Sequence, residues 1–457
     1  MSIYKACDIR GRYGEELRDQ TAIRLGYAIA HYCGEIDILV GGDGRLSTPV
    51  LKDHLVMALS TAGCRVTDVG TVPTPALYFA RRHTGIDAAV MVTASHNPPS
   101  DNGFKLTLGP EPIKPEHIEA LAGLMEGNSQ PITHSPQPVH HIDILPDYAT
   151  FAQSQTSDLS GMKVIVDCAN GVGGLAGHQI WQATGAQVSY LFDTPDGRFP
   201  NHAPDPSDVR NLQALCKAVE DHGADLGVAY DGDADRVVFV DSHGRPLSGD
   251  RAIVIFLRHA LRAGPAPIVY DQKCSLIVPD AIRKMGGQPV VERSGHTFIK
   301  STFLRLNAPY AGEISGHHFF GLLGGDDGII ASLYMANLVR SSGETLASIA
   351  DSIHTNPITP DIRLQMDEGT SRRVLGQLTE ALAGEATLTT LDGLRADFTD
   401  GWGMARQSVT QAALTLRFEG TDQQSLDRIM RRFEHAAPEL TGKLTIPATD
   451  HETDLAL

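Results

Sequence analysis

The chain lacks the features that mark secreted and membrane-spanning proteins. No apolar run approaches the roughly 18 residues that cross a bilayer, and the N-terminus is charged within ten residues, unlike a secretory leader. Its six cysteines are widely spaced and include no Cys-x-x-Cys pair. We therefore expect reduced, mostly core thiols in a soluble cytoplasmic protein with no membrane partner.

The chain is also poor in positive charge. Lysine and arginine number 38 against 55 aspartates and glutamates, which gives a formal net charge of −17. A surface of this sign repels nucleic acid and anionic membranes, so we expect neither as a partner. A small anion remains possible where a local basic cluster attracts it.

Short β-branched runs alternate with helical stretches along most of the chain. In the N-terminal part we expect strands at residues 36–43, 64–70 and 87–95, with a helix at 48–63 between the first two. The strand, helix, strand order restarts near residues 162 and 266. A length of 457 residues is enough for several domains. The pattern predicts three similar α/β units.

Changes of composition predict the domain boundaries. Residues 127–147 are rich in proline and polar side chains, which places a boundary near residue 142, and a second is expected near residue 245. Beyond residue 357, acidic helices precede an alternating strand, so a smaller α+β domain is expected there. The predicted domains are 1–142, 143–245, 246–357 and 358–457.

Three aspartates follow an apolar strand at two-residue intervals in the sequence AYDGDADRVVFVD. A turn would bring the oxygens of Asp231, Asp233 and Asp235 onto one hard divalent cation. An EF-hand also begins D-x-D-x-D, but its glycine and glutamate positions hold Arg236 and Ser242 here. The simpler alternative is a solvated acidic turn, which explains poorly why the run follows a buried strand. We expect Mg²⁺ bridged to a phosphate.

Ser95 is the candidate acceptor of that phosphate. No G-x-S-x-G motif surrounds it, and His96 should point away from it in an extended strand, so a hydrolase triad is not expected. The serine ends an α/β strand, where ligand crevices form, and Pro98 and Pro99 would stiffen its loop. A turn serine bonding its own backbone explains this stretch equally well.

Several motifs in a fixed order add a family resemblance. TASHNPPSDNGFK, DGDADR and GEISGHHFF carry it, supported by ACDIRG, DGRLSTP, DGRFPNHAPDP, YDQKCS and SGHTFIK. Over nearly its whole length the chain resembles the α-D-phosphohexomutase family, and within it the bacterial phosphomannomutase/phosphoglucomutase enzymes. The resemblance implies three related α/β domains with mixed sheets around a central cleft, plus a smaller C-terminal α+β domain.

The resemblance also implies a reaction. Ser95 carries a phosphoryl group and, with Asp231, Asp233 and Asp235, binds Mg²⁺. It gives that group to the free hydroxyl of a hexose 1- or 6-phosphate, forming a hexose 1,6-bisphosphate, which returns its other phosphate to Ser95. Glucose 1,6-bisphosphate is then both intermediate and activator. We expect a monomer whose partners are small hexose phosphates.

The remaining site residues are assigned by the same resemblance. The catalytic candidates beside the serine are Lys105, Arg10, His317 and His96. The substrate-binding candidates are Arg236, Lys273, Gly295, His296, Glu313, Ser315, His317, Arg406, Ser408 and Thr410. In the family, residues matching Glu313 and Ser315 bind the 3- and 4-hydroxyls, which glucose and mannose share. This implies activity on both sugars, and it does not exclude a 2-acetamido sugar or a phosphoglucosamine-type mutase.

Some of these residues have simpler explanations. His96 and His317 could each be structural, and the Gly295-His296 turn before a helix also serves packing. Two sites depart from the family pattern: Gly42 stands where many relatives carry arginine, and Val409 and Ala412 replace a polar residue and a proline in the phosphate-binding loop. We expect phosphate binding to survive, while its tightness stays open.

A different class of enzyme is the main alternative. Gly171, Gly173 and Ala176 follow a strand in G-x-G-x-x-A spacing, and Asp193 lies about 20 residues further on, as in NAD-dependent oxidoreductases. Against this, the polar DCAN separates strand and glycine, and the aspartate run stays unexplained. A glycine-rich strand-to-helix turn accounts for the motif more simply. A non-catalytic sugar-phosphate-binding protein is a third possibility.

Overall fold

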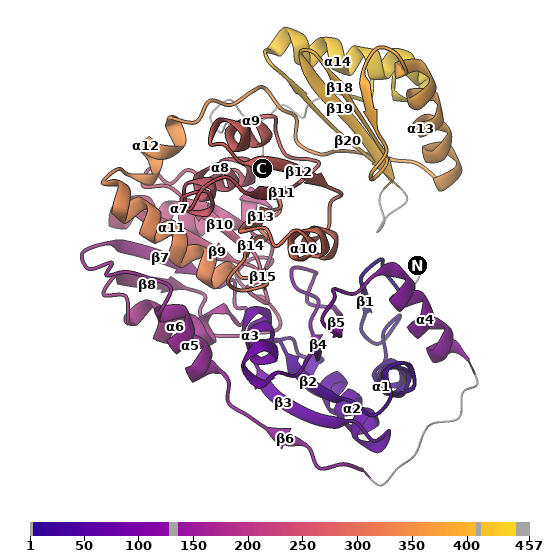
Figure 1. Ribbon diagram of the computed structural model, residues 1–457, viewed down its shortest axis with the longest axis vertical. Coiled ribbons are helices and arrows are strands. Elements are labelled where there is room, and N and C mark those ends of the chain that lie inside the picture. The colour runs from indigo at the N-terminus through magenta and orange to yellow at the C-terminus, as the bar shows by residue number, and fades with distance from the viewer. Residues whose placement is uncertain (1–2, 128–135, 408–412, 445–457) are drawn as a thin grey trace.

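The computed structural model describes residues 3–127, 136–407 and 413–444. The chain forms four domains, each built on its own sheet. In Figure 1 they follow one another around the molecule, and the C-terminal domain stands apart from the other three.

The first domain has a six-stranded sheet in the order β1-β5-β4-β2-β3-β6. Its inner strand β4 reads AAVMV, pairs parallel to β2 and antiparallel to β5, and is buried along its whole length. Its elements are β1 (Asp8–Arg12), α1 (Asp19–Cys33), β2 (Asp37–Gly42), α2 (Thr48–Thr61), β3 (Arg65–Thr71), α3 (Thr74–Thr84), β4 (Ala88–Val92), β5 (Asp101–Leu108), α4 (Pro115–Glu126) and β6 (His140–His141).

The second domain has the sheet order β10-β9-β7-β8. Its elements are α5 (Leu145–Gln153), β7 (Lys163–Asp167), α6 (Gly173–Gln182), β8 (Gln187–Leu191), a 3-10 turn (Val209–Leu212), α7 (Gln213–His222), β9 (Leu226–Tyr230) and β10 (Val237–Val240).

The third domain has the order β12-β11-β13-β14-β15. Its elements are α8 (Gly249–Ala260), β11 (Pro267–Asp271), α9 (Ile277–Lys284), β12 (Gln288–Glu292), α10 (His296–Arg305), β13 (Tyr310–Gly312), β14 (His318–Phe320), β15 (Gly325–Asp326), α11 (Gly328–Ser342) and α12 (Leu346–Asp351).

These three domains repeat one topology. In each, three parallel strands lie side by side with the first strand of the repeat in the middle: β3-β2-β4, β8-β7-β9 and β12-β11-β13. A further strand then pairs antiparallel with the last strand of each trio, β4, β9 or β13. Buried apolar residues of all three domains, such as Leu77, Trp181 and Phe256, belong to one continuous core. The predicted three related α/β domains with mixed sheets are confirmed.

The fourth domain is α+β, as predicted. Its sheet, ordered β16-β20-β19-β18-β17, is antiparallel throughout, α13 and α14 pack on it, and its core is separate from that of the other domains. Its elements are β16 (Ile362–Gln365), α13 (Glu368–Leu382), β17 (Thr387–Thr389), β18 (Leu394–Phe398), β19 (Gly401–Gln407), β20 (Ala413–Gly420), α14 (Gln423–Ala436) and a 3-10 turn (Pro438–Leu440). The exact domain boundaries remain predictions.

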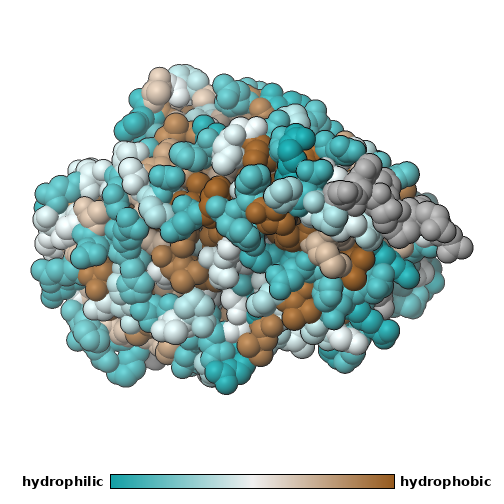
Figure 2. All heavy atoms as spheres, turned by 90° about the horizontal axis from the view of Figure 1, so that it is seen from below, coloured by the Kyte–Doolittle hydropathy of each residue, from teal (hydrophilic) through white to brown (hydrophobic). Residues whose placement is uncertain are grey.

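One face of the surface is largely polar (Figure 2), and the cysteines fit the expectation of core thiols in part. Figure 2 shows one face that is mainly hydrophilic, with apolar side chains in separate spots. Within the described ranges, none of the helices has the length and apolar character needed to cross a membrane. All six cysteines are free thiols, of which three are buried and three are partly exposed.

Candidate active site

Ser95 lies in the loop that follows β4, in a backbone conformation that is unusual for its residue type. Its φ of 51° falls in the left-handed region, which L-residues other than glycine rarely adopt. The Thr93 hydroxyl accepts a hydrogen bond from the Ser95 amide at 2.8 Å. The side chain is buried, and its Oγ donates to Oδ2 of Asp231 at 2.5 Å. The loop therefore aims the hydroxyl at the aspartate run.

Arg45 anchors this loop. Its guanidinium is buried beside Asp43 at 3.2 Å and donates to four carbonyl oxygens of the loop at 2.6–3.0 Å. The carbonyls belong to Ser95, Asn97, Pro98 and Asp101. The motif DGRLSTP contains this arginine, but no role for it was predicted. A short motif with a single arginine was the only signal that could have found it.

The three aspartates converge as predicted. Asp231, Asp233 and Asp235 follow β9, are fully buried, and offer ligand oxygens within 4.8 Å of one another. Gly232 lets their loop approach the serine loop, since a Cβ there would lie 2.5 Å from the carbonyl oxygen of Ser95. The spacing of two residues thus places three carboxylates against the serine hydroxyl.

Lys105, on β5, balances part of this negative charge. Its Nζ lies 2.7 Å from Oδ2 of Asp233 and also contacts Oδ2 of Asp235. Burial would lower the pKa of Lys105, but the two carboxylates raise it well above its usual value, so the ammonium stays charged. Burial raises the pKa of Asp231, and the neighbouring carboxylates raise it further. Burial opposes ionisation of Asp233 too, yet Lys105 and Thr74 hold its pKa at about 2.

The same three aspartates can hold a cation. Among the described atoms, Oδ1 of Asp233 and Oδ1 of Asp235 are buried without a hydrogen-bond partner. Buried carboxylate oxygens that lack partners are costly unless a cation satisfies them. An all-oxygen set of this kind suits a hard divalent ion such as Mg²⁺. The residues present therefore fit the predicted metal site.

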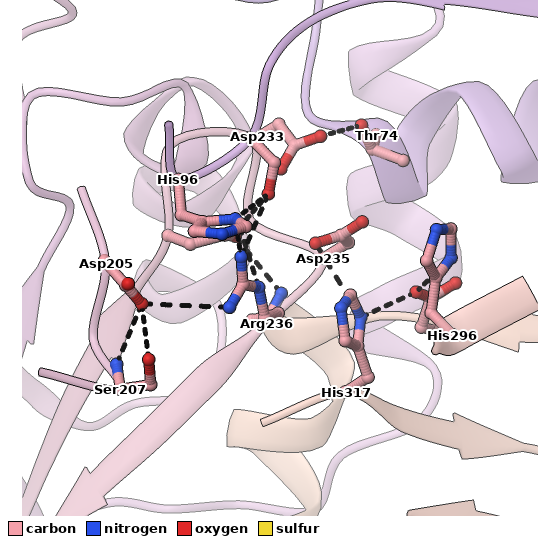
Figure 3. A network of polar contacts seen from close by, with 12 residues as sticks. Thr74, His96, Asp205, Ser207, Asp233, Asp235, Arg236, His296 and His317 are labelled. Carbon is pink, nitrogen blue, oxygen red and sulfur yellow. Dashed lines mark hydrogen bonds and ion pairs between the residues drawn. The ribbon is translucent and has the colours of Figure 1, made fainter. Parts of the chain in front are cut away.

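Two arginines and a histidine surround the serine loop. Arg10 donates to Oδ1 of Asn97 at 3.0 Å, and Arg236 donates to Ser95 Oγ at 3.4 Å. Figure 3 shows the ring of His96 against the guanidinium of Arg236, and its Nδ1 lies 3.4 Å from Ser95 Oγ. The expectation that His96 points away from Ser95 is wrong, because the left-handed turn at Ser95 breaks the alternation of an extended strand.

His317 lies on the far side of Asp235. Figure 3 shows its ring between Asp235 and His296. Its Nδ1 is 2.8 Å from Oδ2 of Asp326 and 3.8 Å from Oδ1 of Asp235, and its ring stacks on that of His296 at 5.2 Å. Burial would lower the pKa of His317, but the two carboxylates raise it, whereas burial takes the pKa of His296 well below its usual value. Asp326 was not predicted, since nothing in GGDDG marks it.

The turn after β13 presents two polar groups that have no protein partner. Across the residues that the structure describes, Oε2 of Glu313 and Oγ of Ser315 are buried and unpaired. Gly316 shapes the turn at a φ of 96°, where an added Cβ would lie 2.7 Å from the carbonyl oxygen of Val237. Unpaired groups of this kind are typical of a site that binds hydroxyls.

The other predicted substrate residues lie on neighbouring elements. Gly295 precedes α10 at a φ of 124°. Lys273 pairs with Asp361 at 3.0 Å and Arg406, on β19, with Asp392 at 2.5 Å. Both cations are mostly buried, with side chains that are 16% and 18% exposed. Ser408, Val409, Thr410 and Ala412 lie outside the described residues.

Packing explains the glycine at position 42 and the glycines of the G-x-G-x-x-A motif. A Cβ at Gly42 would lie 2.5 Å from Cγ2 of Thr48. In this chain, the methyl group of Thr48 therefore occupies the space that a longer side chain at position 42 would need. A Cβ at Gly171 would lie 2.5 Å from the carbonyl oxygen of Gly232, and one at Gly173 would lie 2.9 Å from the ring of Tyr230. The glycines of the NAD-like motif thus pack beside the aspartate loop, as a strand-to-helix turn requires.

A serine hydroxyl bonded to one of three converging carboxylates, with arginine and lysine around it, is a combination typical of metal-assisted phosphoryl transfer. Comparison with known proteins agrees. Models of phosphoglucomutase/phosphomannomutase match all four domains: α/β/α domains I, II and III match residues 1–131, 142–244 and 248–356, and the C-terminal domain matches residues 362–436. The chain belongs to the phosphoglucomutase/phosphomannomutase family of enzymes.

Relatives match over nearly the full length. A phosphomannomutase/phosphoglucomutase of Pseudomonas aeruginosa is 38% identical over 453 residues, with 98% of this chain and 97% of that protein covered. A phosphoglucomutase of Neisseria gonorrhoeae is 36% identical, covering 94% and 96%. The crystal structure of a family protein from Burkholderia thailandensis superposes with a TM-score of 0.89 at 32% identity, covering 97% and 99%. The predicted family and enzyme class are confirmed.

Proposed function

We propose that this enzyme interconverts the 1- and 6-phosphates of glucose and mannose through phospho-Ser95 and a hexose 1,6-bisphosphate. One observation carries the proposal: Ser95 Oγ lies 2.5 Å from Asp231, inside a set of three buried carboxylates that fits a divalent cation. A nucleophile held at a cation site is what phosphoryl transfer needs. A phosphoserine ester resists water, so the enzyme keeps its phosphate between turnovers.

The cation is proposed to be Mg²⁺, held by Asp231, Asp233 and Asp235 together with the phosphorylated Ser95. When bound, it withdraws charge from the oxygens of the transferring group. Glucose 1,6-bisphosphate is proposed as intermediate and as the activator that phosphorylates Ser95.

The chain's own groups do the rest of the chemistry. Arg236 lies 3.4 Å from Ser95 Oγ, and Arg10 holds the serine loop beside it, so both can stabilise charge on the transferred phosphate. Lys105 stays charged between the carboxylates, and we assign it to charge stabilisation. His317 is the proposed group that takes the proton of the sugar hydroxyl, and His96, whose Nδ1 lies 3.4 Å from Ser95 Oγ, is the proposed group that returns a proton to that oxygen.

Sugar recognition is proposed for the turn after β13. Glu313 and Ser315 offer unpaired oxygens that can bond the 3- and 4-hydroxyls, which glucose and mannose present alike. Gly295, His296 and Lys273 form the wall beside it, and Arg406 with Ser408 and Thr410 binds the phosphate that is not reacting. A site that bonds only the 3- and 4-hydroxyls makes no contact with the hydroxyl at C2, where glucose and mannose differ. Both hexoses should therefore be substrates.

A coupled assay tests this proposal. Glucose 1-phosphate, mannose 1-phosphate and N-acetylglucosamine 1-phosphate are supplied side by side, with and without glucose 1,6-bisphosphate. We expect turnover of the first two, increased by the bisphosphate, and none with Ser95→Ala. Preference for the acetamido sugar would assign a phosphoglucosamine-type mutase instead. Full activity of Ser95→Ala would reject the phosphoserine mechanism. Light scattering of the purified chain checks the proposed monomer.

A further inference from the structure

A second group of metal-ligating side chains lies on the opposite side of Asp235 from the serine. Asp235, His317 and Asp326 each offer one ligand atom, and these atoms lie within 4.8 Å of one another. The two aspartates are fully buried, and the His317 side chain is 9% exposed. The group joins the second domain, which provides Asp235, to the β14 and β15 region of the third.

The polar atoms that face each other in this group are unsatisfied. Among the residues described, Nδ1 of His317, Oδ1 of Asp235 and both oxygens of Asp326 are buried without a hydrogen-bond partner. Nδ1 of His317 lies 2.8 Å from Asp326, but the contact lacks hydrogen-bond geometry, because the nitrogen is aimed between the two carboxylates. Figure 3 shows the ring in this position beside Asp235. Buried groups of this number without partners call for a ligand.

We propose that Asp235, His317 and Asp326 form a second divalent-metal site, specific for Zn²⁺ and similar ions. One imidazole nitrogen and two carboxylates are ligands that Zn²⁺ accepts readily, whereas Mg²⁺ prefers oxygen ligands alone. Nδ1 of His296 lies 3.7 Å from Asp326, has no hydrogen-bond partner among the described atoms, and is within reach as a further ligand. Binding through Nδ1 needs neutral His317 with its proton on Nε2, so a proton bound at Nδ1 leaves to solvent.

An approach to the site exists. A cavity of about 430 Å³ is lined by Lys105, His296 and Lys300. Lys105 contacts Asp235, His296 stacks on His317, and Nζ of Lys300 lies 3.7 Å from the ring centre of Tyr78 in the same wall. The cavity wall therefore includes two side chains, His296 and Lys105, that contact members of the proposed ligand set.

Occupation of this site inhibits the enzyme. Zn²⁺ ties up the imidazole of His317 and draws one carboxylate of the Mg²⁺ triad toward itself, because Asp235 belongs to both sets. This consequence rests on the proposed function, in which His317 moves a proton and the triad holds Mg²⁺. Zn²⁺ binding itself does not depend on that function.

X-ray absorption at the zinc edge tests the binding without any variant. The full-length protein is saturated with Mg²⁺ and then given one molar equivalent of Zn²⁺. We expect the outer-shell scattering of an imidazole ring around the zinc, because His317 is a ligand. A spectrum with oxygen ligands alone overturns the proposal, since it places Zn²⁺ in the aspartate triad.

A pair of variants tests the ligand set. Asp326→Asn removes one anionic ligand with little change of volume, and Asp327→Asn makes the same change one residue away, at a carboxylate that accepts from Tyr148 at 2.8 Å. Zn²⁺ retained after dialysis against excess Mg²⁺ is measured by elemental analysis. We expect Asp326→Asn to weaken retention at least about tenfold and Asp327→Asn to keep the wild-type content. Equal Zn²⁺ affinity in wild type and Asp326→Asn overturns the proposal.

Inhibition assays separate this proposal from the proposed function. The Zn²⁺ concentration for half inhibition in excess Mg²⁺ should rise at least about tenfold in Asp326→Asn, in step with the loss of affinity. If the protein binds Zn²⁺ through imidazole but has no mutase activity, the proposed function fails and the metal site stands. If the mutase is active and imidazole scattering is missing, the metal site fails alone.

Discussion

Ser95 has a backbone conformation that costs about 1–2 kcal/mol for an L-residue, and it keeps that conformation because its neighbours hold it. Arg45 contributes hydrogen bonds to four carbonyl oxygens of the serine loop. Arginine suits this task since its planar fork presents five donors in fixed directions. The serine hydroxyl is thereby placed before substrate arrives.

Arg45→Lys should lower kcat by about 100-fold with little change in KM, because a displacement of about 1 Å at reacting groups costs that much. Lysine keeps the charge that faces Asp43 but cannot reach four carbonyls. Steady-state kinetics measure the effect. Arg65→Lys is the control, as Arg65 pairs with Asp37 on the surface. A wild-type kcat in Arg45→Lys would show that the serine loop keeps its conformation without the hydrogen bonds of the guanidinium.

Asp233→Asn should raise the Mg²⁺ concentration needed for half-maximal activity and lower turnover, since one of three anionic ligands becomes neutral. Asp221→Asn, at an exposed pair with Lys217, is the matched control. Treatment of the wild type with EDTA should abolish activity, and added Mg²⁺ should restore it. Normal turnover of EDTA-treated enzyme in metal-free buffer would make the aspartate loop purely structural.

At the scale of elements, three loops that end parallel strands meet at the site. The loop after β7 packs on the aspartate loop after β9, which in turn packs on the serine loop after β4. Two glycines make these contacts possible: a Cβ at Gly171 would lie 2.5 Å from the Gly232 carbonyl, and one at Gly232 would lie 2.5 Å from the Ser95 carbonyl. The stack of backbones sets the distance between Ser95 and the three aspartates.

Gly232→Ala should push the aspartate loop away from Ser95. We expect kcat to fall by about 100-fold and the Mg²⁺ requirement to rise, because the Ser95–Asp231 contact widens. Gly177→Ala is the control: it lies in α6, a Cβ there meets nothing within 4 Å, and alanine should stabilise the helix by up to about 1 kcal/mol. Kinetics and thermal melting of both variants measure the difference, and equal kcat values would refute the close-approach argument.

Elements were easier to predict than the contacts between them. The strands and the three α/β units follow from short β-branched runs that alternate with helical stretches, which is a local signal. The bonds that build the site join residues far apart in sequence: Thr74 and Asp233 are separated by 159 positions, and Lys105 and Asp235 by 130. The role of Asp326 depends on such contacts, and the true direction of His96 depends on the left-handed conformation of Ser95. A pattern of residue types in the sequence predicts neither.

At the scale of the whole molecule, the proposed site draws residues from each domain. The first three domains share a continuous core, and the fourth has its own. The described contacts of the fourth domain with the third are largely polar: Glu419 accepts from Ser275, and Lys273 pairs with Asp361. Ser95, the three aspartates and the turn after β13 therefore lie in domains that share one core, while Arg406 belongs to a separately packed domain.

Arg406→Ala should raise KM more than it lowers kcat. The reason is that Arg406 would bind the phosphate that is not reacting with equal free energy in the ground state and in the transition state. A charge-assisted hydrogen bond is worth about 1.5–3 kcal/mol, so kcat/KM should fall by about 10- to 150-fold, alike for glucose and mannose substrates. Arg428→Ala, at a surface pair with Asp400 in the same domain, is the control. An unchanged KM would mean that other cations of the cleft bind this phosphate.

The central claim is that Ser95 passes its phosphoryl group to the sugar in every cycle. The most direct measurement is a chase: enzyme labelled with radioactive phosphate from glucose 1,6-bisphosphate is mixed rapidly with unlabelled glucose 1-phosphate. We predict that the label maps to Ser95 and moves into sugar bisphosphate at a rate no slower than kcat. Label that sits on another residue, or that leaves Ser95 more slowly than the enzyme turns over, would contradict the account.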